Sequence, residues 1–197
     1  MALIKSTGTP PTLNHNRFYP AWDRTTALRT FSFEGREYTV TIDGDKRVAY
    51  GEGLLTGYRH YDTKGVKPAF AFGFGKSYTD FRFSALKVKN ESSKGRPRYI
   101  VSFDVTNTGS INGKEVAQIY VRPVDAKVFR PYKELKGFEK KIIRAGETVR
   151  FEIELTDEAF AYYKTSIHDF GYDPGKFEIL VGNASDNILL RKTVSVK

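Results

Sequence analysis

From residue 99 to the end of the chain, short apolar runs are separated by turn residues; most of them place apolar side chains at every second position, whereas Val116–Val121 is nearly continuous in apolar character. The first run, Tyr99–Val105, shows the pattern, which returns at 149–155 and 177–181. This alternation places the apolar residues on one face of an extended strand and so favours half-buried β-strands over helices. The turns between the runs are rich in Gly, Asn and Pro, namely Asn107-Thr108-Gly109, Asn112-Gly113, Arg144–Glu147 and Pro174-Gly175. About seven such strands predict an all-β, immunoglobulin-like β-sandwich of the fibronectin type III kind over residues 81–197, interrupted by one short helix from Thr156 to Tyr163.

The first 49 residues follow no steady period and are interpreted as an irregular extension. Within it, a short helix is predicted near Thr25–Thr30. A small hairpin is predicted over residues 36–50, because Tyr38, Val40 and Ile42 alternate with polar residues before the turn signal Asp43-Gly44.

Residues 50–81 read YGEGLLTGYRHYDTKGVKPAFAFGFGKSYTDF and differ from both neighbouring regions. The stretch is too apolar for a free loop and too rich in glycine for a regular core strand. It is therefore interpreted, over residues 50–80, as a connector pressed between two domains. Arg59 and Asp62 are expected to lie in extended chain and to need separate or lateral polar partners.

Composition excludes several classes of function. The chain has no Cys, which rules out disulfides and Cys-ligated zinc. The net charge of +9 is spread along the chain without a dense basic block, so no nucleic-acid partner is expected. No run approaches the length of a membrane span, and the N-terminus has no apolar signal-peptide core, which leaves localisation open.

No independent catalytic site is predicted either. The carboxylates of the sandwich read as solvated or ion-paired groups rather than an acid–base pair; they are Glu134, Glu139, Glu147, Glu152 and Glu154. His15, His60 and His168 lack metal-ligand spacing, and the glycine motifs fail the nucleotide-binding fingerprints. We therefore expect no catalytic, metal or cofactor-binding residue, and no cofactor.

Residues 50–197 resemble the C-terminal portion of glycoside hydrolase family 3 enzymes of the β-glucosidase type. The resemblance over the connector rests on Tyr50-Gly51-Glu52-Gly53, Gly57–Asp62 and Ser77-Tyr78-Thr79. Over the sandwich it rests on motifs of the fibronectin type III-like domain, among them Val105–Gly109, Gln118-Ile119-Tyr120, Arg130-Pro131 and Lys133–Glu139.

The resemblance implies a scaffold rather than a reaction centre. In such enzymes the nucleophilic Asp and the acid/base Glu belong to a barrel and an α/β domain, which precede the matched region and hydrolyse terminal β-D-glucosides with retention. Those domains are the implied partners, and this 197-residue chain is expected to be inactive by itself. The predicted inter-domain docking residues are Glu52, Tyr58, Arg59, Tyr61, Asp62, Phe70, Phe72 and Tyr78.

Two alternatives stay open. The chain could be a stand-alone module that contacts polysaccharide or a protein partner, since aromatic faces stack on sugar rings; the candidates are Tyr58, Tyr61, Tyr78 and Tyr132. It could also be a small active hydrolase, which turnover of an aryl β-glucoside by the pure chain would reveal.

Overall fold

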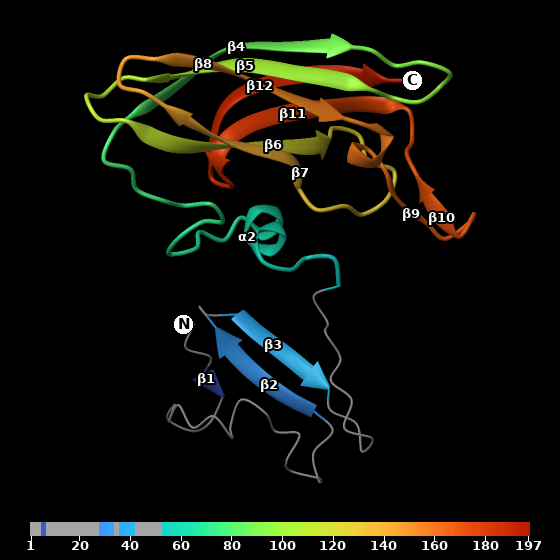
Figure 1. Ribbon diagram of the computed structural model, residues 1–197. Coiled ribbons are helices and arrows are strands. Elements are labelled where there is room, and N and C mark those ends of the chain that lie inside the picture. Colours follow the sequence, from blue (N-terminus) through green and yellow to red (C-terminus); the bar gives the residue numbers. More distant parts are fainter. Residues whose placement is uncertain (1–4, 7–27, 34–35, 42–52) are drawn as a thin grey trace. The chain divides into compact units, whose positions relative to one another are not determined.

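The computed structural model describes residues 5–6, 28–33, 36–41 and 53–197, in two units, Met1–Gly53 and Leu54–Lys197 (Figure 1). The first unit contains an antiparallel sheet in the order β1–β2–β3, with bounds Lys5–Ser6, Leu28–Phe33 and Arg36–Thr41.

The outcome for the predicted hairpin is mixed. Its first strand is present as β3, but the observed partner is the preceding strand β2, from Leu28 opposite Thr41 to Phe33 opposite Arg36. The predicted turn at 43–44 lies outside the described residues. The helix predicted near Thr25–Thr30 is wrong for residues 28–30, which belong to β2, because antiparallel pairing overrides a weak local helix preference.

The second unit is an all-β sandwich of two antiparallel sheets, which confirms the predicted fold class. One sheet has the order β4–β5–β8, with bounds Phe81–Asn90, Tyr99–Asn107 and Thr148–Leu155. The other has the order β12–β11–β6–β7, with bounds Asn187–Val196, Gly175–Ala184, Gly113–Pro123 and Glu134–Ile143.

The core lies between the two sheets and consists of the alternating residues that the sequence pattern singles out. Along β5, Tyr99, Val101, Phe103 and Val105 are buried, while the residues between them are only partly covered. The Phe103 ring stacks between Phe83 and Phe151, at centroid distances of 6.0 and 5.4 Å. Burial of these large rings is the main stabilising contribution to the sandwich.

Short elements complete the unit. A 3₁₀-helix, η2, covers Asp157–Ala159, and a hairpin pairs β9, Tyr162–Lys164, with β10, Asp169–Gly171. The predicted helix from Thr156 to Tyr163 is therefore wrong in its second half, where Tyr162 and Tyr163 enter a strand instead. The α-helix α2 spans Tyr58–Lys64. In the part of the chain that the structure describes, no helix has the length and apolar character needed to cross a membrane.

Candidate docking surface

Helix α2 lies along the side of β6 and β7 that faces away from the other sheet (Figure 1). Glycines flank the helix at both ends, Gly57 with φ 56° and Gly65 with φ 65°, in backbone conformations that other residues rarely adopt. The expectation that Arg59 and Asp62 lie in extended chain is wrong, because these two glycines delimit one compact helical segment. The expectation that they need separate partners is confirmed, since Arg59 pairs with Glu134 and Asp62 with Lys133.

Polar contacts, rather than apolar burial, fasten α2 to the sandwich, since none of its residues is fully buried. The Asp62 carboxylate lies 2.7 Å from the Lys133 ammonium. Two main-chain amides of the sandwich donate hydrogen bonds to side chains of α2: Leu135 N–H to the Tyr58 hydroxyl at 2.8 Å and Tyr132 N–H to the Thr63 hydroxyl at 2.9 Å. We call these three contacts the α2 latch.

Lys133 is the most deeply placed charge of the latch. Its side chain is 5% exposed, and its ammonium group lies 5.5 Å from the centre of the Tyr120 ring and 5.4 Å from that of Tyr132. A buried ammonium without a counter-ion is strongly unfavourable. Lys133 therefore needs the Asp62 carboxylate as its counter-ion, and this ion pair ties the position of α2 to that of the sheet.

The residues beneath α2 are polar groups that the connector covers. The Tyr58 ring packs edge-on against Tyr120 at 5.7 Å, and burial raises the pKa of the Tyr120 hydroxyl. That hydroxyl donates to Gln118, whose amide in turn donates to the Asn183 carbonyl at 3.1 Å. Gln118 and Tyr120 are both buried although they point away from the sandwich core.

The connector after α2 is bound to the sheet through its main chain. The Phe72 carbonyl accepts a hydrogen bond from Ser185 N–H at 2.8 Å. Gly73, with φ +85°, passes so close to Gln118 that a Cβ would lie 2.2 Å from its amide nitrogen. Farther along, the buried Thr79 hydroxyl donates to the Asn107 side chain at 2.5 Å. The path of the connector is thus fixed along its length.

The other side of the connector is a row of exposed rings, which we call the outer aromatics. Phe70 is 72% exposed, Phe72 50%, Phe74 49% and Tyr78 99%. Phe70 and Phe74 pack on each other at 5.1 Å, and Phe72 packs on Tyr58 at 5.3 Å. Several exposed aromatic rings gathered on a fixed main chain are typical of an interaction site.

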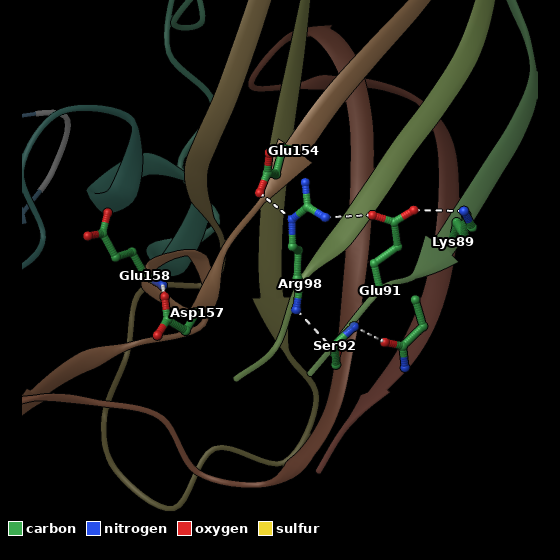
Figure 2. Close-up of polar contacts among 8 residues, drawn as sticks. Lys89, Glu91, Ser92, Arg98, Glu154, Asp157 and Glu158 are labelled. Atoms are coloured by element: carbon green, nitrogen blue, oxygen red, sulfur yellow. Dashed lines mark hydrogen bonds and ion pairs between the residues drawn. The ribbon is translucent and has the colours of Figure 1, made fainter. Parts of the chain in front are cut away.

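The outer face of the β4–β5–β8 sheet has the opposite character (Figure 2). There Glu91 lies between Lys89 and Arg98, each 2.7 Å away, and Arg98 reaches Glu154 at 2.7 Å. Hydrogen bonding to Lys89 lowers the pKa of Glu91, and hydrogen bonding to Arg98 lowers that of Glu154. Such an exposed network of paired charges is typical of a surface in contact with water.

The candidate residues from the sequence separate into two groups. The first group contacts the sandwich of this chain and consists of Tyr58, Arg59 and Asp62. The second group is exposed and consists of Phe70, Phe72 and Tyr78. Tyr61 belongs to neither group, since it is partly covered and lies beside His60. Glu52 lies outside the described residues. Sequence reasoning missed Phe74 and Lys133 as members of this surface, although Lys133 directly follows the singled-out Tyr132.

Of the candidate carboxylates of the sandwich, Glu134, Glu139 and Glu154 form ion pairs. Glu134, expected at the surface, is largely covered, and its carboxylate lies 2.5 Å from Arg130 and 3.9 Å from both Arg59 and Lys136. Glu139 pairs with Lys141 at 3.2 Å. Within the described ranges, no three His, Asp or Glu side chains gather as metal ligands would.

Comparison with known proteins identifies the domain. Residues 115–185 match the family model of the fibronectin type III-like domain. The chain is 46% identical over 152 residues to the thermostable β-glucosidase B of Acetivibrio thermocellus, covering 77% of this chain and 20% of that protein. It is 38% identical over 150 residues to an exo-α-(1→6)-L-arabinopyranosidase of Bifidobacterium breve, covering 76% and 19%.

Solved structures of β-glucosidases are also similar to this chain. The GH3 β-glucosidase of Bifidobacterium adolescentis superposes with a TM-score of 0.73 at 36% identity, over 77% of this chain and 22% of that one. β-Glucosidase 3B of Thermotoga neapolitana gives 0.69 at 37% identity, over 78% and 21%. The chain thus spans about a fifth of the length of the relatives it matches. It contains a fibronectin type III-like domain and matches, over about three quarters of its length, a C-terminal portion of glycoside hydrolase family 3 β-glucosidases.

Proposed function

We propose that residues 54–197 are a non-catalytic scaffold module of a β-glucosidase-type glycoside hydrolase. In this role the outer aromatics dock against the barrel and α/β domains, which hydrolyse terminal β-D-glucosides with retention. One observation supports this proposal most strongly. The main chain of the connector and helix α2 are bound to the sandwich, while the connector's rings Phe70, Phe72, Phe74 and Tyr78 stay exposed.

Rigid placement is the mechanical contribution of such a module. The α2 latch and the Phe72–Ser185 hydrogen bond fix the outer aromatics relative to the sandwich. A domain docked on them is therefore held in one orientation. In an active site built from two domains, a misplacement of about 1 Å can lower the rate by on the order of 100-fold.

The test uses a hybrid enzyme, the β-glucosidase B of Acetivibrio thermocellus with its matching 152-residue stretch replaced by that of this chain. Phe70→Ala is compared with Phe170→Ala on β10, because the two rings are 72% and 69% exposed and each packs on one other ring. In the isolated chain both variants should change the free energy of unfolding little. In the hybrid, Phe70→Ala alone should lower the free energy of unfolding by about 2–4 kcal/mol, and it should also lower the rate of aryl β-glucoside hydrolysis. Equal behaviour of the two variants in the hybrid would refute docking through the connector.

A second function, polysaccharide contact, is favoured by the exposure of Tyr78 at 99% and Tyr132 at 44%. Aromatic stacking on sugar rings is insensitive to salt, unlike adsorption through the +9 net charge. Retention of the chain on insoluble glucan at high salt, lost in Tyr78→Ala, would support this function. Elution by salt would count against it.

A further inference from the structure

Strand β7 carries two exposed apolar side chains on the same face of the sheet as α2 and the connector. Phe138 is 70% exposed and Ile142 62%. Their neighbours Gly137 and Ile143 face the core, so the strand's alternation directs Phe138 and Ile142 outward. The strand register places Phe138 opposite Gln118 and Ile142 opposite Lys114.

Gln118 joins this part of β7 to the connector. It is the residue against which Gly73 packs, at 2.2 Å from the position of a Cβ, and it is also the cross-strand neighbour of Phe138. Phe138 therefore lies on the same face of the sheet as the connector, one cross-strand neighbour away from Gly73's contact with Gln118. The exposed Lys114 and Lys140 lie on the same face, and neither has an ion pair within the described ranges.

We propose that the docking surface continues onto the outer face of β7, with Phe138 and Ile142 as apolar contacts, Lys140 between them and Lys114 opposite Ile142 on β6. This inference rests on the proposed function, and it adds β7 to the connector as a second region that contacts the other domains. The occupant is the part of the β-glucosidase-type polypeptide outside the matched fifth, presenting both apolar groups and carboxylates.

Two observations favour this occupant. In the relatives, the polypeptide outside the matched part is about four times as long as the matched part, and Gln118, the cross-strand neighbour of Phe138, also contacts the connector at Gly73. The two lysines of this face complement carboxylates, whereas Arg98 and Arg150 of the other sheet are already paired with carboxylates of this chain.

Hydroxyl-radical footprinting with residue-level mass spectrometry tests the proposal without any substitution. The oxidation rates of Phe70, Phe138 and Phe170 are compared between the isolated 197-residue chain and the hybrid enzyme. These rings are 72%, 70% and 69% exposed, so they should react comparably in the isolated chain. In the hybrid, Phe70 and Phe138 should react several-fold more slowly, while Phe170 is unchanged.

Each other outcome has a defined meaning. Protection of Phe70 without Phe138 would overturn this inference and leave the proposed function standing, whereas protection of neither would overturn both. Concentration-dependent protection of Phe138 in the isolated chain, with dimerisation in sedimentation, would assign the face to a second copy and overturn the proposal. Protection by added soluble glucan would assign it to polysaccharide, with the same consequence.

A variant supplies an independent readout. Phe138→Ser should leave the melting temperature of the isolated chain unchanged but raise the rate of thermal inactivation of the hybrid several-fold. The control is Phe170→Ser, which is expected to alter neither. Equal inactivation rates of the two hybrids would contradict a contact at β7.

Discussion

Replacing Asp62 by Asn removes the negative charge of the α2 latch and leaves Lys133 buried without a counter-ion. The Lys133 and Asp62 side chains are 5% and 13% exposed. Breaking one partner of a buried pair costs about 3–5 kcal/mol, and the partial exposure of Asp62 places the expected value near the lower end, about 3 kcal/mol. The cost falls on the docking of α2, because the sandwich core makes no use of this pair.

Hydrogen exchange of two main-chain amides measures this docking directly. The N–H groups of Tyr132 and Leu135 donate to side chains of α2 in the latch, so their exchange is expected to speed up when α2 detaches. At about 1.4 kcal/mol per factor of ten, the Asp62→Asn variant should accelerate both amides by about 100-fold. Amides at the centre of β5 should keep their protection.

A matched variant isolates the effect of burial. Asp104→Asn also removes a carboxylate from an ion pair, but its partner Arg150 is 52% exposed, and an exposed pair contributes less than about 1 kcal/mol. It should leave the exchange of Tyr132 and Leu135 unchanged. Unaltered exchange of these two amides in Asp62→Asn would refute the claim that the buried pair holds α2 in place.

Three further outcomes are expected. Gly73→Ala should lower the melting temperature more than Gly65→Ala, because both have positive φ but only Gly73 would also collide with Gln118; equal shifts in calorimetry would contradict the close approach. Glu115→Gln should stabilise the chain at neutral pH, because burial raises the pKa of Glu115, so its charged form opposes folding above that pKa. The gain should vanish as the pH falls and Glu115 becomes protonated, and chemical denaturation at several pH values checks this sign. Phe103→Ala should cost about 3–5 kcal/mol in denaturant unfolding, because the ring is fully buried between two others, and a loss below about 1 kcal/mol would refute the assigned core.

The same reasoning explains which parts of the docking surface were predictable. Glycine and aromatic content in residues 50–80 indicated an interaction segment, because those residue types suit neither a free loop nor a core strand. The helix between Gly57 and Gly65 was missed, since its seven residues carry no apolar stripe and gain their stability from contacts with β7. Phe138 was also missed, because the lysines and glutamates around it resemble a solvated face.

By itself the sequence determined the sandwich, because period-two alternation and turn residues act over a few neighbouring positions and leave one way to bury the apolar face. Tertiary structure alone decided which groups became partners. Lys133 and Asp62 are separated by 71 positions, and only the packing of α2 on the sheet brings them within 2.7 Å. Tertiary structure likewise decided which aromatic rings stayed uncovered, since exposure depends on what folds over a residue and alternation fixes only its face.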